Sequence, residues 1–278
     1  MFTTCLERET IERIVASPAV QELAGKPRYS VFMHPETSTN SWINMTDCDF
    51  DNRTHLFKTA VLAQGIADTE GVDRDATHQA VLTGMVHDAA ESIVGDKCFH
   101  NKTEADEDEE IDLLDSLVDS NRLKLTRDEL ALVKETMQDK KNGPETKAGT
   151  IFDISEVYGY QLSALTAWNG QKTNSDSTRF EQQHLQRLLA INVTAVQLAI
   201  LIGYHNKGYR TPRILFDNNT ETIDAIFNFG ADPRVMDDHT EHCHRSGFGH
   251  KAEILRENFV ATSGLWLAYR SMLKPQVA

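Results

Sequence analysis

The chain has 278 residues, of which 40% are hydrophobic and 25% are charged, as in an ordinary globular protein. Its formal net charge is −14, and no basic run appears in the sequence. Because phosphate backbones are bound through clustered Lys and Arg side chains, this charge argues against a nucleic-acid polymer as the substrate. A small anionic nucleotide remains compatible, since a metal ion and one or two buried cations can hold it locally.

The cysteines and the apolar segments indicate where the protein resides. The four cysteines are scattered and form no Cys-x-x-Cys pair, which indicates reduced thiols: Cys5, Cys48, Cys98 and Cys243. The first residues lack the layout of a signal peptide. The longest apolar stretch, Leu188 to Tyr204, is interrupted by polar residues and favours a core helix over a membrane span. We therefore expect a cytoplasmic protein that does not cross a membrane.

Helical periodicity dominates the first half of the chain. The alternating segment Tyr29 to Met33 is the one strand candidate. Thr54 is the expected N-cap of a helix with an aliphatic face, and Asp75 that of the next helix. This second helix leads into Val86-His87-Asp88-Ala89-Ala90-Glu91, and we consider it helical through Glu91. Gly95 is then placed to end it.

The second half continues the helical pattern. Thr126 and Glu129 fit a capping box. Pro144 is the expected first residue of a helix that carries Asp153. The acidic run from Ala105 to Glu110 is interpreted as a solvated helix start.

Beyond residue 168 the chain has a polar loop and further helices. A long helix is expected from about Phe180 to Gly203, and another helical region closes the chain. The His-rich segment from Asp237 to His250 is interpreted as a mobile loop rather than a second metal site. We therefore predict an all-α fold, with a core over residues 1–168 and a helical extension over residues 169–278 packed on it.

Four residues are competent metal ligands: His55, His87, Asp88 and Asp153. Imidazole and carboxylate groups together suit a divalent metal ion. In a helix, the spacing of His87, Asp88 and Glu91 would place all three on one face. Such a face is costly to bury unless a cation or hydrogen bonds compensate it.

These residues resemble the His…His-Asp…Asp signature of the HD-domain phosphohydrolases. The finer pattern His-Asp-Ala-x-Glu-x-x-x-Gly-Asp, from His87 to Asp96, is similar to the bacterial and phage 5′-deoxynucleotidase branch. The resemblance covers roughly residues 28–168. It implies an HD-domain helical bundle and a divalent metal ion, which could be Co, Mn, Zn, Fe or Mg. The implied metal ligands are His55, His87, Asp88 and Asp153.

The resemblance also implies roles for residues around the metal. Glu91 and Asp96 are the implied groups for proton transfer, and Lys102 is implied to neutralise charge on the phosphate. Trp42 is implied to pack against the sugar, where an apolar wall disfavours a ribose 2′-hydroxyl. Relatives of this kind are often dimers, so a homodimer is implied as well.

The chain departs from the family pattern at two positions. Ser41 stands before Trp42, where the family usually has an Arg, so a phosphate-binding cation is missing. Asn44 replaces an aliphatic residue and offers both a donor and an acceptor to a base edge. Arg53, two residues before His55, is a candidate to replace the missing cation.

The function expected from these residues is hydrolysis of 5′-deoxyribonucleoside monophosphates to a deoxynucleoside and phosphate. One alternative is a deoxynucleoside triphosphohydrolase, a reading that Asn44 favours because it could contact a purine. Another, from a different class, is a non-catalytic nucleotide sensor, which would not need Glu91, Asp96 and Lys102. Phosphate, pyrophosphate and triphosphate release from mono- and triphosphates discriminates among them.

Overall fold

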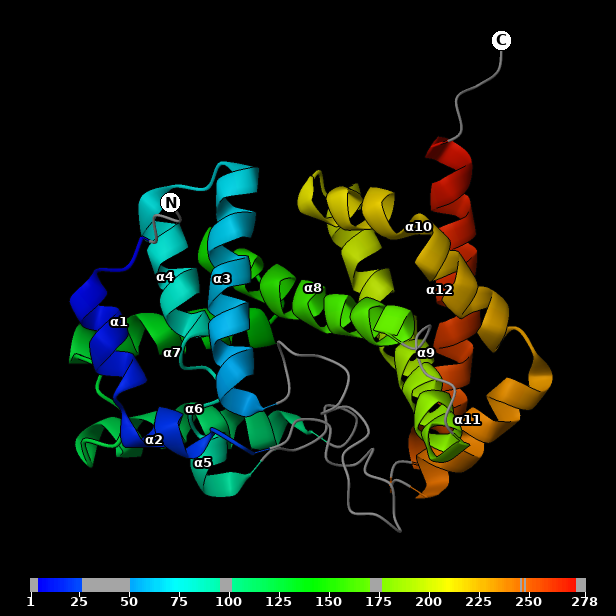
Figure 1. Cartoon of the computed structure of the whole chain (residues 1–278). Coiled ribbons are helices and arrows are strands. Elements are labelled where there is room, and N and C mark those ends of the chain that lie inside the picture. The colour runs from blue at the N-terminus through cyan, green and yellow to red at the C-terminus, as the bar shows by residue number, and fades with distance from the viewer. Residues whose placement is uncertain are drawn as a thin grey trace. The chain divides into compact units, whose positions relative to one another are not determined.

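The computed structural model describes residues 5–26, 51–95, 102–170, 177–245, 247 and 249–273. All regular elements within these ranges are helices, so the all-α fold is confirmed (Figure 1). The strand expected at Tyr29–Met33 lies outside the described residues.

The described residues form two compact units, which meet in sequence between Gly159 and Tyr160. Unit 1 takes in those of Met1–Ser30 and Asp47–Gly159. Its helices are α1 (Arg8–Val15), α2 (Pro18–Glu22), α3 (Asn52–Glu70), α4 (Arg74–Gly84), α5 (Glu91–Val94), α6 (Glu104–Asp119), α7 (Arg127–Lys141) and the first part of α8 (Lys147–Gly170). The division into residues 1–168 and 169–278 stays a prediction.

Unit 2 contains the described residues of Tyr160–Ala278. It consists of the end of α8, α9 (Ser177–Asn206), α10 (Thr211–Gly230), α11 (Pro233–Arg245), the short 3-10 helix η3 (Gly249–Lys251) and α12 (Ala252–Leu273).

Two helix starts in unit 1 differ from those expected. Asp51, not Thr54, is the N-cap of α3, and its carboxylate accepts a hydrogen bond from the Thr54 backbone N–H at 2.7 Å. Asp73, not Asp75, is the N-cap of α4 and accepts from the Ala76 N–H at 3.0 Å. In both cases an aspartate stands two or three residues earlier and satisfies the same capping rule.

The later helices of unit 1 follow the sequence more closely. The capping box of Thr126 and Glu129 is present at the start of α7, as predicted. The prediction that Pro144 opens the next helix is wrong, because α8 begins at Lys147. Asp139 accepts backbone hydrogen bonds from Glu145 and Thr146, both at 3.1 Å. These bonds stabilise the turn before α8, so the helix begins three residues after Pro144.

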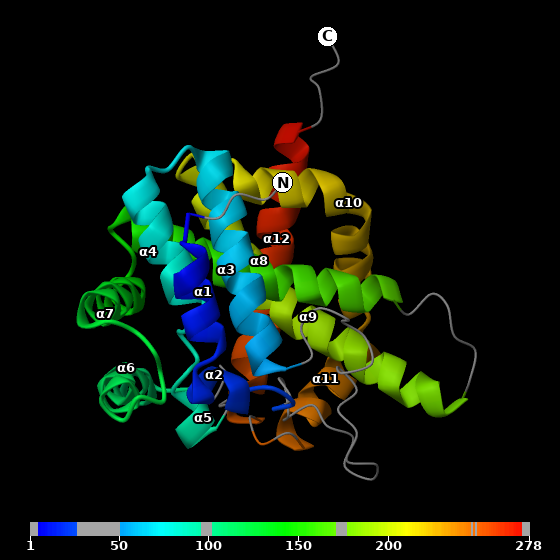
Figure 2. The same ribbon diagram turned by 60° about the vertical axis from the view of Figure 1, so that its left-hand side comes forward.

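Helices α3 and α4 lie side by side, as Figures 1 and 2 show from two directions. They come closest at Gly84, the last residue of α4. A Cβ added there would lie 2.9 Å from the backbone N and Cα of Ala60 in α3. Only a residue without a side chain permits this approach. The contact fixes the end of α4 against the middle of α3.

The core of unit 2 forms where α9 packs against α10 and α12. The buried side of α12 repeats at helical spacing through Leu255, Phe259, Thr262, Trp266 and Tyr269. Among the described residues, one segment of α9, Gln186–Asn206, is long and apolar enough to cross a membrane. However, 72% of its most apolar window is buried, as in the core helix expected there.

The His-rich segment is not the loop that the sequence suggested. Most of it belongs to α11, and His239 and Cys243 of that helix are buried, with 1% and 0% of their surfaces exposed. The His239 ring contacts the Asn192 amide of α9 at 3.3 Å. Buried apolar residues at helical spacing, Val235 and Met236 among them, explain why the segment folds as a packed helix.

We predict that Gly84→Ala lowers the free energy of unfolding by about 1–3 kcal/mol, because the new methyl group meets backbone atoms that cannot move aside. Gly65→Ala in α3 is the matched control, since a Cβ there meets no atom within 4 Å. It should be neutral or stabilising by up to about 1 kcal/mol. Chemical unfolding monitored by circular dichroism measures both changes. Equal stabilities of the two variants would contradict the close-contact explanation.

We also predict that unit 2 becomes less stable as the pH decreases, because of His242. Burial, followed by the charges of His239 and Arg245, lowers the pKa of His242 from its ordinary value of 6.5 to about 4. The unfolded chain therefore binds a proton that the folded chain does not, so the stabilising contribution is complete above pH 6.5 and is lost as the pH falls toward 4. The melting temperature of His242→Gln should fall less than that of the wild type across this window. Equal decreases in melting temperature for the two proteins between pH 6.5 and pH 4 would contradict this prediction.

Candidate metal centre

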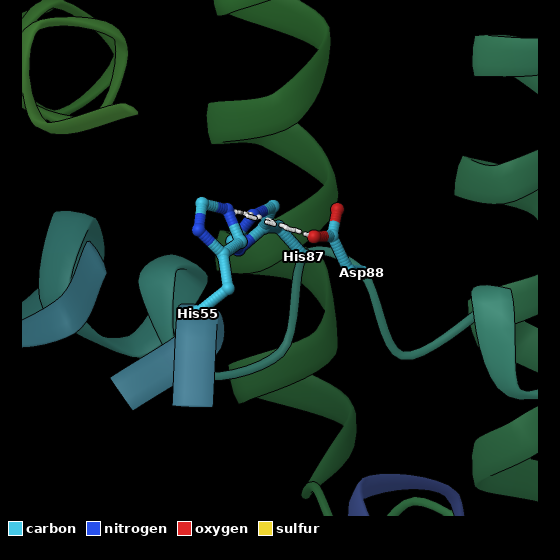
Figure 3. A group of neighbouring side chains, drawn as sticks. All are labelled: His55, His87 and Asp88. Atoms are coloured by element: carbon cyan, nitrogen blue, oxygen red, sulfur yellow. Dashed lines mark hydrogen bonds and ion pairs between the residues drawn. The ribbon is translucent and has the colours of Figure 1, made fainter. Parts of the chain in front are cut away.

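Three of the four predicted metal ligands come together in unit 1. His55 lies on α3, and His87 and Asp88 lie in the turn after α4 (Figure 3). All three are buried, with exposed fractions of 1%, 4% and 8%. Their ligand atoms lie within 4.8 Å of one another. They are the one such group of histidine, cysteine and acidic residues found in the described part of the chain.

The spacing of the donor atoms fits a bound metal ion. His55 Nε2 lies 3.3 Å from His87 Nε2, and Asp88 Oδ2 lies 3.3 Å from His87 Nε2 and 3.7 Å from His55 Nε2. In the plane of these three atoms, the point at equal distance from all of them is about 2.0 Å from each, as calculated from the three distances. Bonds from Zn²⁺ to imidazole nitrogen and carboxylate oxygen have this length.

The orientation of His87 is set by its other ring nitrogen. His87 Nδ1 lies 3.1 Å from the carbonyl oxygen of Gly84, so that Nδ1–H donates and Nε2 keeps its lone pair. The Phe152 ring of α8 packs edge-on against the imidazole, with the centroids 5.3 Å apart. Gly84, the residue at the α3–α4 contact, thus also orients a candidate metal ligand.

The helix expected to run through Glu91 is interrupted. Helix α4 ends at Gly84, residues 85–90 form turns, and α5 begins at Glu91. The backbone N–H groups of Ala89 and Glu91 bond to carbonyls three residues earlier, at 2.8 and 3.0 Å. This tighter winding replaces the i, i+4 spacing on which the shared face of His87 and Glu91 depended.

The surroundings of His87 favour a positive charge. Burial lowers the pKa of the His87 imidazole, but the charges of Asp88 and Glu156 outweigh it and leave the pKa raised. Glu156 of α8 reaches His87 Nε2 at 3.5 Å, and it is paired with Lys140 of α7. A divalent cation would satisfy the same carboxylates more fully than a proton does.

Asp153, the fourth predicted ligand, is not part of the group of three. It lies on α8, one turn before Glu156, and is half-buried. Burial lowers the pKa of the nearby Lys140 ammonium, but the charges of Glu156 and Asp153 leave that pKa raised. Metal ligation by Asp153 stays a prediction.

A cavity of about 60 Å³ lies beside His55, His87 and Asp88, which we call the metal-competent group. This volume has room for a few water molecules or a small anion. Its wall includes the candidate ligands His87 and Asp88, as well as Lys102, which lies two residues before α6. The other lining side chains come from α6, α7 and α8: Glu107, Glu110, Ile111, Met137, Lys140, Lys141, Phe152 and Glu156.

Lys102 lines this cavity, and its role toward a phosphate stays a prediction. Its ammonium lies 2.5 Å from Glu110 Oε2. Burial lowers the pKa of Lys102, but Asp88 and Glu110 outweigh it, so that the pKa is raised and the amine is charged. Burial raises the pKa of the Glu110 carboxyl, and Lys102 only partly offsets this.

The other predicted site residues have different places. Glu91 is buried and accepts a hydrogen bond from Asn52 of α3, and it is not among the residues that line the cavity. Arg53 reaches Gln21 at 3.2 Å on an exposed surface and does not line the cavity either. Trp42, Asn44 and Asp96 lie outside the described residues.

Sequence reasoning did not assign five charged residues of the cavity to the site: Glu107, Glu110, Lys140, Lys141 and Glu156. Glu110 was assigned to a solvated acidic run, although only 4% of its surface is exposed. Its spacing of four and seven residues from Leu114 and Leu117, which are buried, could have revealed it. No comparable local signal distinguishes Lys140 from its neighbours at the end of α7.

We predict that the chain binds about one divalent transition-metal ion and that His55→Ala and His87→Ala each weaken binding more than the about 10–100-fold typical of an outer-sphere change. Asp112→Ala is the control, because Asp112 is an acid of α6 with 84% of its side chain exposed. Metal analysis after dialysis measures the stoichiometry, and Asp153→Asn tests the fourth ligand. A full metal content in the double histidine variant would exclude this site.

No family model, curated protein or solved structure matches this chain.

Proposed function

We propose that this protein is a metal-dependent phosphohydrolase of small deoxyribonucleotides, with 5′-deoxyribonucleoside monophosphates as the substrates. One observation carries the proposal: the metal-competent group His55, His87 and Asp88 adjoins a cavity that three lysines also line. Metal ligands and ammonium groups on one small cavity are what a phosphoryl group requires.

The charges of the cavity support a role for the metal in anion binding. Four carboxylates line it (Asp88, Glu107, Glu110 and Glu156), against three ammonium groups (Lys102, Lys140 and Lys141). With His87 neutral, the wall therefore carries one excess negative charge. A divalent cation would turn it into one excess positive charge, so we expect a phosphate to bind only together with the metal.

The resemblance to HD-domain phosphohydrolases supplies the remaining roles. His55, His87 and Asp88 would hold the ion, with Asp153 as the expected fourth ligand. When bound, the ion would polarise a phosphoryl oxygen and lower the pKa of a water molecule. Lys102 stabilises negative charge that develops on the phosphoryl oxygens. Glu91 and Asp96 are the residues implied in proton transfer.

Substrate selection is assigned to residues that lie outside the described part of the chain. By the same resemblance, Trp42 packs against the sugar and disfavours a 2′-hydroxyl, while Asn44 contacts the base. The cation that the family usually has before the Trp is absent, and Lys140 and Lys141 offer charge to the same phosphate. The homodimer and the cytoplasmic location stay predictions.

We predict that the metal-loaded protein releases phosphate from deoxyribonucleoside monophosphates and that His87→Ala abolishes this release. Lys102→Ala should lower kcat by about 10²–10³-fold, the usual effect of losing one group that stabilises transition-state charge. Lys134→Ala is the control, because Lys134 lies on α7 but pairs with Asp115 away from the cavity. Phosphate, pyrophosphate and triphosphate are quantified separately, with dAMP, AMP and dATP as competing substrates.

Phosphate release that survives chelation, or that is unchanged in His87→Ala, would refute the proposed function. Triphosphate release from dATP without turnover of dAMP would replace the monophosphatase by a triphosphohydrolase. Equal kcat/KM values for AMP and dAMP would remove the sugar preference.

A further inference from the structure

One side of α12 is apolar and exposed to solvent. Four large hydrophobic side chains on it have exposed fractions of 67%, 46%, 62% and 70%, in the order Val260, Leu265, Leu267 and Met272. With Ile254, α12 holds five of the nine exposed large hydrophobic side chains in the described part of the chain. Such side chains are common when they are scattered singly, whereas their concentration on one element marks an interaction surface.

Small residues form a line between these large side chains. They are exposed and stand three, four and three positions apart: Ala261, Gly264, Ala268 and Ser271. This spacing has the heptad period, so the four residues follow one another along the same side of the helix. The large side chains flank the line in two pairs, one on each side and each seven residues apart: Val260 with Leu267, and Leu265 with Met272. We call these eight residues the α12 face.

The α12 face is uncharged, although the chain has a net charge of −14. The exposed acidic residues of α12, Glu253 and Glu257, lie in its first two turns, before the face begins. The one polar member of the face, Ser271, donates its hydroxyl to the Ala268 carbonyl at 2.7 Å. Covering the face would therefore remove no charged member from water and would leave the Ser271 hydroxyl satisfied.

Gly264 lies in the middle of the face, and packing within the chain does not require a glycine there. A Cβ added to Gly264 would meet no atom within 4 Å, and its φ angle is not positive. Glycine inside a helix is unfavourable compared with alanine. A glycine on an exposed apolar side does, however, allow the backbone of a second helix to come close.

We propose that the α12 face is a dimer interface, covered by the α12 face of a second copy of this chain. The two helices would run antiparallel about a two-fold axis that passes near residue 266. Gly264 would then lie opposite Ala268 of the other copy, and Ala261 opposite Ser271. Leu265 and Leu267 of both copies would close the contact on either side of the axis. One surface serves both partners, as a two-fold interface requires.

Charge favours this partner and this orientation. Two copies that each carry a net charge of −14 repel each other, so they pair most easily through an uncharged surface. A parallel pair would place Glu253 and Glu257 of one copy beside the same residues of the other, whereas an antiparallel pair places them at opposite ends. The α12 face contains no residue of the candidate metal centre, so its pairing is independent of the proposed function.

The size of the α12 face fits a reversible dimer. From their exposed fractions, the eight residues present roughly 600 Å² on each copy, so a pair would bury up to roughly 1,200 Å². This area is the lower limit of the standard size for specific interfaces and is common in transient ones. We therefore expect a dissociation constant of about 1–100 µM.

Sedimentation equilibrium of the full chain tests the dimer. The mass of the wild type should rise with concentration toward twice the 31.3 kDa of one chain. Leu265→Glu and Leu267→Glu each bring two like charges together at the axis, so each should raise the dissociation constant at least about 100-fold. Ile214→Glu on α10 is the matched control, because Ile214 and Leu265 have the same exposed fraction of 46%. It should leave the dissociation constant unchanged.

Gly264→Leu separates pairing from folding. Its side chain would meet no atom of its own chain, and leucine favours a helix, so the diluted monomer should melt no lower than the wild type. The same side chain would keep the two helices apart and should raise the dissociation constant at least about tenfold.

Disulfide cross-linking tests the orientation. On oxidation, an equimolar mixture of the Ala261→Cys and Ser271→Cys proteins should link position 261 of one chain to position 271 of the other, because these positions face each other in the antiparallel pair. Mass spectrometry of the digested product identifies the linked positions. A link between two copies of position 261 would show a parallel pair and overturn the proposed orientation.

Three results would overturn the interface. A wild type that stays monomeric at all concentrations would show that the α12 face has no second copy as its partner. A dimer that persists unchanged in Leu265→Glu and Leu267→Glu would place the interface elsewhere. Equal weakening by Ile214→Glu and Leu265→Glu would show an effect of added charge alone.

Discussion

The close approach of α3 and α4 is the constraint on which the candidate site depends. Gly84 touches the backbone of Ala60, so the two helices meet without an intervening side chain. This brings His87, three residues past Gly84, to within 3.3 Å of His55 between the ring Nε2 atoms. A cation held by these two nitrogens and the Asp88 carboxylate would stabilise the arrangement that the helix packing imposes. One glycine therefore links the helix packing to the geometry of the candidate metal site.

Around this pair, buried charges are arranged so that most have a partner. Lys140 pairs with Glu156, which contacts His87, and Lys102 pairs with Glu110. A buried charge is tolerated only when it is compensated, so these pairs hold the cavity wall in one arrangement. Among the described residues, Glu110 Oε1 is an exception, because it is buried and has no hydrogen-bond partner.

The metal-competent histidines and the histidines of α11 illustrate how similar residues acquire different roles. His239 and Cys243 are both buried, yet Cys243 Sγ lies 3.8 and 3.9 Å from the two nitrogens of the His239 ring. The sulfur therefore faces the ring rather than one lone pair, whereas His55 and His87 direct Nε2 atoms toward a shared point with a carboxylate. The residue type supplies donor atoms, but the orientation of the side chains decides whether those atoms can bind one metal ion together.

The sequence by itself determined the helical class, the capping box at Thr126 and the chemistry of the metal ligands, because each depends on residue identity or on neighbours within a few positions. It misplaced the caps of α3 and α4 and the helix through Glu91, where neighbouring positions satisfy the same local rules. Only the tertiary structure decided that Glu110, Lys140 and Glu156 share a cavity with His87. Which residues share the cavity depends on helices that are distant along the chain. The spacing of Glu110 from Leu114 and Leu117 indicates only that Glu110 is buried, not which residues face it.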